Sequence, residues 1–543
     1  MPPEVAPDPG DVEERVDLRH RSPLDALRRV LGPPRTYRLT RTLLLRLLGV
    51  VYLFAFVGLI MQALPLIGSR GLTPAIDVLS HLQATDRGLF DVPTLFWLDV
   101  SDPMLMGCAW LGAALAVIVI AGYANAPVMF LLWIIYGSFV RVGGLWFGFG
   151  WEIQLLETGC LAIFLAPPLD PRPLASRPPT ITSIILHRWL IARIMLGAGL
   201  IKLRGDACWT ELTCLDHHFE TQPIPNPLSA WFHHLPHAVH ATGVIFNHVV
   251  ELLAPWVVFG PRRLRLIAAV AMATLQVILI VSGNLAFLNW LTLVPIIACF
   301  DDDFLLRLMP RRPRGWIVAR TAAADAAGRA EPTRASRIAA SMLAAVVAIF
   351  SFEVIANLAS SQQTMNRSFD RLELVNTYGA FGAITPVRHE LIIEGSRDAD
   401  PEQATWQAYE LPCKPGALDR RPCVLGPYHR RFDWLLWFAA MRDKPGQVPW
   451  LVHAVWKLLH ADRGVRSLFA VDPFGDRPPR WIRIRRFVYT LAPADSPDWW
   501  QRSDEEEWLS PVSVDSASLQ DYLVPLGWPS PIDAPAPTPD AAP

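Results

Sequence analysis

The chain has 543 residues, of which 52% are hydrophobic and 18% are charged, and its formal net charge is −1. Soluble domains carry about 25% charged residues, so this composition argues against a soluble protein, and the balanced charge gives no reason to expect a nucleic-acid partner. The 21 Trp are many for this length, as is typical of spans anchored at the membrane surface.

Nine apolar runs approach the roughly 20 residues that a helix needs to cross a bilayer. They predict an α-helical polytopic membrane domain over residues 43–300 and one last span over residues 338–358. The runs near Ala126 and Ile153 are short or polar, and re-entrant segments are the alternative for them. The runs are Leu43–Leu66, Pro103–Gly122, Ala126–Val142, Ile153–Pro168, Ile181–Leu203, Ala238–Gly260, Leu264–Ser282, Leu285–Phe300 and Ile338–Leu358.

Arginines gather in a head over residues 1–42, which includes Arg38 and Arg41, and in a loop over residues 301–337. The positive-inside rule places both segments in the cytoplasm, and eight predicted spans between them agree with that assignment. The loop 204–237, here called the outer loop, and everything after the last span then face the periplasm or the lumen of the endoplasmic reticulum. We expect this outer side to be the functional face.

The part after the last span is predicted to be a second, β-rich and sandwich-like domain over residues 362–495. Two segments in it, Phe432–Met441 and Pro449–Ala461, have the apolar spacing of helices. Residues 496–543, with the acidic run Ser503–Trp508, are predicted to form a disordered tail. The expected strands, rich in β-branched and aromatic residues, are Leu372–Gly382, His389–Ser396, Trp406–Leu411 and Trp481–Leu491.

Polar signatures interrupt the apolar runs, namely WEIQLLETG, IKLRGDACW, DHHFETQPIPNP and SGNLAFLN. A charge at the centre of a bilayer costs about 3 kcal/mol even on the lower scales, so it usually marks function or a paired contact. We therefore treat these signatures as candidates for a functional surface. The candidates are Trp151, Glu152, Glu157, Lys202, Asp206, Trp209, His217, Glu220, Gln222, Pro223, Glu251 and Asn284.

Two of these charges allow both a structural and a chemical interpretation. Glu157 is expected to pair with Arg188 or Arg193 of the next long span, with a substrate contact as the alternative. Lys202 follows the small residues of Gly197–Gly199, which let helices approach closely. It is expected either to snorkel to the interface or, if desolvated, to act as a base.

The outer loop is rich in histidine, but no HExxH or paired ExxH spacing accompanies it. We interpret these histidines as hydrogen-bonded loop residues and predict no metal site. The sequence also has no GxSxG elbow, phosphate-binding loop or GxGxxG, so no cofactor is predicted. The pairs Cys208–Cys214 and Cys413–Cys423 are close in sequence and, on the outer side, are expected to form two disulfides.

Long segments carry a family resemblance: VYLFAFVGLIMQALPLIGSRGLTPA, WEIQLLETGCLAIFLAPP, and on to DPFGDRPPRWIRIRRFVYTL, about residues 48–491 in all. They resemble the lipase maturation factor family, and the Ala/Arg/Pro-rich style suggests a bacterial member. The resemblance implies a membrane-embedded factor, not an enzyme, that helps secreted lipase-like clients to fold and assemble, with membrane lipid as its other partner. The membrane would be that of the endoplasmic reticulum, or the inner membrane in a bacterium.

A weaker resemblance relates the membrane half to vitamin K-dependent gamma-carboxylase, where a Lys in the region that matches Lys202 acts as a base. It implies an alternative function, a membrane enzyme acting on a quinone or lipid substrate, with Lys202, Glu157 and His217 lining one pocket. A folding factor would instead bind its client through exposed aromatic residues of an extended outer loop. The residues expected to do so are Trp209, Phe219, Trp231 and Phe232.

Overall fold

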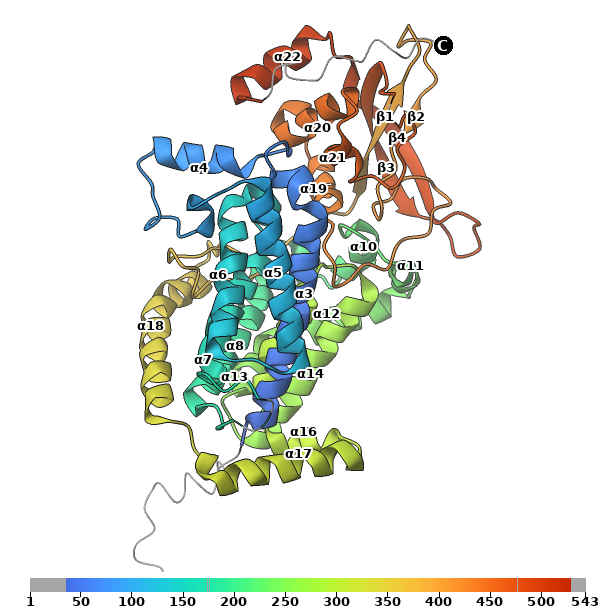
Figure 1. Cartoon of the computed structure of the whole chain (residues 1–543). Helices are drawn as coiled ribbons and strands as arrows, with labels where there is room; N and C mark the ends of the chain where they lie inside the picture. Colours follow the sequence, from blue (N-terminus) through green and yellow to red (C-terminus); the bar gives the residue numbers. More distant parts are fainter. Residues whose placement is uncertain (1–35, 173, 175, 476, 529–543) are drawn as a thin grey trace, which may run out of the picture.

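The computed structural model describes residues 36–528 except residues 173, 175 and 476. A bundle of apolar helices forms its larger part, and a sheet with several short helices caps one end of the bundle (Figure 1). We call this end the outer end. The main helices of the bundle are α3 (Arg38–Ile67), α5 (Asp102–Ala121), α6 (Ala126–Val142), α7 (Gly150–Leu165), α8 (Ile181–Gly205), α12 (His237–His248), α13 (Ala254–Val257), α14 (Arg262–Ser282), α15 (Leu288–Ile296) and α18 (Arg334–Ala359).

Local signals explain where these helices begin and end. Pro103 occupies the first turn of α5, where its missing N–H leaves no hydrogen bond unmade. Gly122 ends α5 with a φ of 99°, the left-handed conformation that favours glycine at a helix C-terminus. Asn125 begins α6, where its side chain accepts a hydrogen bond from the amide of Val128 at 3.1 Å.

The span count of nine is not confirmed. Among the described residues, five helices are long and apolar enough to cross a membrane, namely α3, α5, α8, α14 and α18. Helix α6 and the segment Leu288–Cys299 are apolar but shorter. Helix α7 has 16 residues and carries two buried glutamates, and the apolar run 238–260 is divided by a π-helical segment, Val249–Leu253. The chain is thus a multi-pass helical membrane protein with several part-length helices.

The Arg-rich segment 301–337 is mainly helical, with α16 (Asp302–Leu308) and α17 (Arg311–Ala324) at the end of the bundle opposite the sheet (Figure 1). Most of the predicted basic head lies outside the described residues. Arg38 and Arg41 are buried in α3 rather than exposed in a head. Arg38 pairs with Asp325 at 2.7 Å, and Arg41 donates to the carbonyl of Arg177 at 2.7 Å. Both charges have partners within this end of the bundle, which explains their burial.

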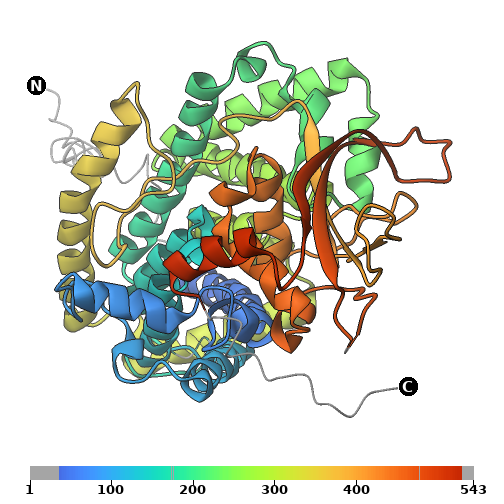
Figure 2. The same ribbon diagram turned by 90° about the horizontal axis from the view of Figure 1, so that it is seen from above.

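The C-terminal part contains one antiparallel sheet in the order β2-β1-β3-β4, so the sandwich-like prediction is wrong. Helices cover one face instead of a second sheet: Leu391 and Ile484 share a core with Leu436 and Leu451. Figure 2 shows these helices over the bundle, with the sheet at one edge and α18 at the other. The elements are β1 (Arg388–Ser396), β2 (Gln407–Ala408), α19 (Arg431–Ala440), α20 (Pro449–Leu459), α21 (Arg463–Arg466), β3 (Trp481–Leu491), β4 (Trp500–Val512) and α22 (Ala517–Leu523).

The expected strand Leu372–Gly382 is irregular backbone that packs against the bundle. Val375, Asn376 and Thr377 are consecutive and at most 1% exposed. An edge strand with one solvated face would not bury neighbouring side chains of both parities. The segment is therefore an inserted strap rather than part of the sheet.

The predicted tail is also wrong for residues up to 528, because β4 and α22 lie within it. Trp500 and Trp508 are 1% and 4% exposed. The acidic run between them faces basic residues of β3: Glu506 pairs with Arg486 at 2.6 Å, and Glu505 pairs with Arg485. The run is thus a cross-strand charge ladder, while residues 529–543 lie outside the described part of the chain.

Short helices of the outer loop complete the outer end of the bundle. They are α9 (Ala207–Thr210), α10 (Cys214–Thr221) and α11 (Pro227–His233), and α4 (Ala75–Ala84) lies at the same end (Figure 1). Ala230 of α11 packs against the sheet face that carries Ile392, Tyr489 and Trp500. The outer loop therefore lies between the bundle and the sheet.

Candidate functional site

Glu152 joins the membrane bundle to the C-terminal part. It lies in the first turn of α7 and is fully buried. Its Oε1 atom is 2.7 Å from Nη1 of Arg431, the first residue of α19, and it also accepts a hydrogen bond from Trp151 Nε1 at 3.1 Å. The Tyr136 hydroxyl donates to the other carboxylate oxygen, and Arg431 donates to the carbonyl of Trp146. A carboxylate predicted at membrane depth is thus neutralised by a residue of the C-terminal part.

Glu157, one turn further along α7, pairs with Arg193 of α8, one of the two partners predicted for it. Arg188 instead donates to the carbonyl of Ala298 at 2.9 Å. The strap closes the Glu157 site, because the Tyr378 hydroxyl donates to the carboxylate at 2.7 Å and the Asn376 amide does so at 3.0 Å. Every side of Glu157 is therefore occupied by protein groups, which leaves no room for a substrate contact.

Arg388 at the start of β1 holds the outer loop through three backbone carbonyls. It donates to those of Glu220 at 2.8 Å, Pro223 at 3.1 Å, and Gln222. Burial lowers the pKa of Arg388 to about 9, and the charge of Glu220 opposes this. The Glu220 carboxylate accepts from the amide of Leu491 in β3 at 2.7 Å. Glu220–Asn226 of the outer loop are therefore buried and fixed to the sheet, although an exposed, extended segment was expected there.

Two further candidates also hold C-terminal backbone. Asn284 donates to the carbonyl of Cys423 at 2.9 Å and accepts from the amide of Leu425 at 2.8 Å. Asp206 accepts from the amide of Ile384 at 3.1 Å. The sequence found these bundle residues by their polarity, but it did not find their partners, such as Arg431, Asn376 and Arg388, which carry no local signal.

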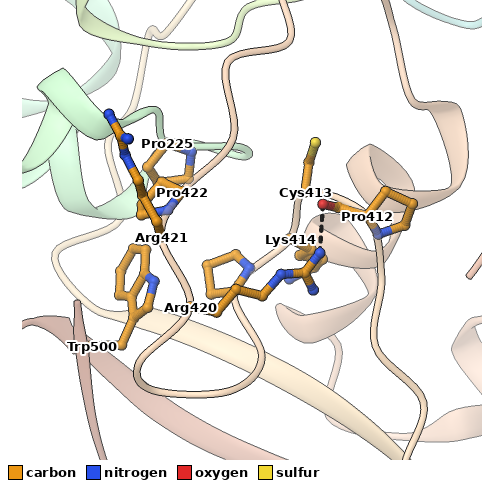
Figure 3. Close-up of a pocket in the computed structure, with 9 residues that line it drawn as sticks. Pro225, Pro412, Cys413, Lys414, Arg420, Arg421, Pro422 and Trp500 are labelled. Atoms are coloured by element: carbon orange, nitrogen blue, oxygen red, sulfur yellow. Dashed lines mark hydrogen bonds between the residues drawn. The ribbon is translucent and has the colours of Figure 1, made fainter. Parts of the chain in front are cut away.

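We call these buried contacts of the bundle and the outer loop with the C-terminal part the joint. Beside the joint the two parts are closely packed. Pro225, Lys414, Arg421 and Trp500 surround a pocket of only about 10 Å³ (Figure 3). That volume holds about one water molecule. The Arg420 side chain donates to the carbonyl of Pro412 at 2.7 Å and so closes the loop that carries Lys414 and Arg421. No small-molecule substrate fits there.

Lys202 is 5% exposed and does not snorkel. Its Nζ atom lies 2.6 and 2.7 Å from the two carboxylate oxygens of Glu251 and 3.3 Å from Asn247 Oδ1. It also stands 5.0 Å from the centre of the Trp209 ring. A Cβ at Gly199 would lie 3.0 Å from Glu251 Cβ, so the small-residue run lets the π-helical segment approach α8. Lys202 is therefore a paired charge between helices.

Lys202 lines a cavity of about 130 Å³, but the other members of the predicted catalytic group do not. Glu157 is enclosed in its own ion-pair site, and His217 is exposed on α10. His218 lines the cavity instead. Burial, helped by the charge of Lys202, lowers the pKa of His218 to about 4, so this imidazole is neutral at physiological pH.

Several histidines of the outer loop and of α12 contact carboxylates or carbonyls. His237 and His240 share Asp216, with distances of 2.9 and 2.8 Å, and the other ring nitrogen of His240 lies 2.8 Å from the carbonyl of Phe232. Within the described part of the chain, no three His, Cys, Asp or Glu residues are grouped so that they could hold a metal ion.

Disulfides join Cys208 to Cys214 and Cys413 to Cys423, the two pairs that the sequence suggested. We expect that alkylation of the unfolded protein without reductant modifies only the three remaining cysteines of the seven. Peptide mass spectrometry after alkylation measures this, and reductant should make all seven reactive. Modification of all seven before reduction would contradict both pairings. The three free cysteines are Cys108, Cys160 and Cys299.

Taken together, the fold and its joint define a multi-pass helical membrane protein whose sheet domain is fixed to the bundle by the buried Glu152–Arg431 ion pair and by buried hydrogen bonds. Family models named for the lipase maturation factor transmembrane domain and C-terminal domain match residues 39–307 and 374–510. The chain therefore belongs to the lipase maturation factor family, as its resemblance indicated.

Named relatives agree with this assignment over nearly the whole chain. Lipase maturation factor 1 of Homo sapiens is 44% identical over 523 residues, 91% of each chain. That of Mus musculus is 43% identical over 525 residues, 91% of this chain and 90% of its own. Lipase maturation factor 2 of Mus musculus is 30% identical over 604 residues, covering 90% and 85%. These animal relatives give no support to the suggested bacterial origin, and no solved structure matches the chain.

Proposed function

We propose that this protein is a membrane-embedded maturation factor for secreted lipase-like enzymes. The observation that carries the proposal is the match to proteins named lipase maturation factor 1, at 42–44% identity over 91% of the chain. It covers the bundle and the sheet domain alike, which the buried joint makes into one unit. Nothing in the geometry favours the alternative enzyme, because Lys202 is paired and its predicted catalytic neighbours lie elsewhere.

The sheet domain and the outer loop are proposed to face the lumen of the endoplasmic reticulum, or the periplasm in a bacterium. Two disulfides lie in these parts, and disulfides persist in oxidising compartments. Helix α17 with its arginines lies at the other end of the bundle (Figure 1), which fits the positive-inside rule. The same topology keeps residues 338–358 as the last span and extends the outer domain, predicted over residues 362–495, to residue 528.

The surface proposed for the client differs from the one that the sequence favoured. Trp209 and Phe219 are only 3% and 6% exposed, so they belong to the core. Trp231 is 58% and Leu228 is 47% exposed, both on α11 beside the sheet domain. Large exposed aromatic side chains are the residues that most often dominate protein contacts. We assign client binding to this face of α11.

The function is tested in mammalian cells whose own lipase maturation factor 1 has been deleted. The chain is expressed with a secreted lipase, and lipase activity in the medium is divided by the amount of lipase protein. We expect the wild-type chain to raise this specific activity. No rescue by a chain that accumulates in the membrane would contradict the proposed function.

The surface is tested with Trp231→Ser. We expect at least a threefold loss of rescue at unchanged abundance, since truncating an interface tryptophan commonly costs about 2 kcal/mol or more. The matched control is Trp256→Ser, because Trp256 is 71% exposed on α13, away from the outer end (Figure 1). Equal rescue by both variants would place client binding elsewhere.

A further inference from the structure

The cavity beside Lys202 is about large enough to hold one small ring compound. It lies among α8, α12, α14 and α15, has a volume of about 130 Å³, and is lined mainly by apolar side chains such as Ala198, Phe246 and Leu279. An engineered apolar cavity of about 150 Å³ holds benzene. The cavity can therefore take one end of a lipid but not a whole lipid.

The polar groups that line the cavity determine which chemical group of a lipid it can bind. Lys202 and Glu251 neutralise each other at 2.6 Å, so together they bring no net charge. Asn289 of α15 lines the cavity and is 4% exposed, and its Nδ2 atom has no hydrogen-bond partner among the described residues. A buried donor without a partner costs about 1–3 kcal/mol. An oxygen of a neutral ligand would satisfy it.

The cavity reaches the surface that faces lipid. Ile278 lines it and is 38% exposed on α14, one of the five helices that are long and apolar enough to cross a membrane. Gly243 and Phe246 of α12 line it as well and are half-buried. A ligand can therefore enter sideways from the bilayer, while its remaining hydrocarbon stays among the lipid chains.

We propose that this cavity binds the carbonyl- or hydroxyl-bearing end of a neutral membrane lipid, with Asn289 Nδ2 donating to the lipid oxygen. Acylglycerols and sterols share this chemistry. The site is separate from the α11 face assigned to the client, so it stands or falls independently of the proposed function.

The test uses the full chain in phosphatidylcholine vesicles that contain a photoreactive, alkyne-tagged lipid. One arm uses a monoacylglycerol, a second cholesterol, and a third phosphatidic acid; labelled peptides are mapped by mass spectrometry. We expect labelling of α8, α14 or α15 by one or both neutral probes, which identifies the source, and at least tenfold less by phosphatidic acid. Preferred labelling by phosphatidic acid would overturn the neutral site.

Two substitutions separate the cavity from general lipid contact. Asn289→Leu should reduce the labelling roughly tenfold, as the loss of one hydrogen bond does. It should not lower the melting temperature of the unliganded protein, because it removes an unpaired donor. Ala198→Phe should abolish labelling by filling the cavity, whereas Ala345→Phe on the exposed side of α18 should not. Labelling unaffected by both cavity substitutions would refute the proposal.

Discussion

Arg431→Met is expected to lower the free energy of unfolding by about 3–5 kcal/mol, the range for removing one partner of a buried ion pair. The Glu152 carboxylate would remain fully buried without its counter-ion. Both residues lie where α7 meets α19, so the loss should appear first as loosening of the C-terminal part. Limited proteolysis of the purified protein and its melting temperature in detergent measure the two effects.

The control for this prediction is Glu506→Gln. Glu506 pairs with Arg486 at a similar distance, 2.6 Å, but its side chain is 54% exposed, and exposed pairs contribute about 0–1 kcal/mol. We further expect the double variant Arg431→Met with Glu152→Leu to recover part of the loss. Recovery should be incomplete because the buried Tyr136 hydroxyl loses its acceptor. Equal effects of Arg431→Met and Glu506→Gln would show that the joint is not a desolvated ion pair.

The sequence predicted the glutamates of the joint but not the C-terminal residues that contact them, for a physical reason. Glu152 and Glu157 are conspicuous because they interrupt apolar segments, where an uncompensated charge is costly. Arg431 and Asn376 lie in ordinary polar stretches more than 200 positions away. No local periodicity connects such positions, so only the tertiary structure reveals that the signatures bind the chain's own C-terminal part.

Whether a strand could be predicted from the sequence depended on the pattern of buried and exposed residues along it. Trp481–Leu491 was predicted with the boundaries of β3, because apolar and polar residues alternate along it. Trp500–Val512 was missed because seven consecutive exposed residues, including the acidic ones, separate its buried tryptophans. Arginines of β3 balance its negative charges. Composition alone does not show that these two segments are neighbours. Hydropathy likewise located the helices of the bundle but not how many of them are long enough to cross the membrane.

Lys202→Met is the second substitution expected to have a large effect, again about 3–5 kcal/mol of lost stability, because Glu251 would be left buried without its cation. Among the residues that the structure describes, Asn247 Nδ2, 3.0 Å away, would be the one donor left to the carboxylate. Lower abundance in the membrane and a lower melting temperature in detergent are the expected results. A loss of lipase rescue by this variant therefore does not by itself indicate catalysis.

The double variant Lys202→Met with Glu251→Leu decides between a structural and a chemical role for Lys202. Apolar residues of similar volume often replace a buried ion pair at little cost or with a gain in stability, so abundance should return close to wild type. A structural pair predicts that specific lipase activity in the medium returns with it. An essential base predicts abundant, folded protein without activity, since no side chain at position 202 would then accept a proton.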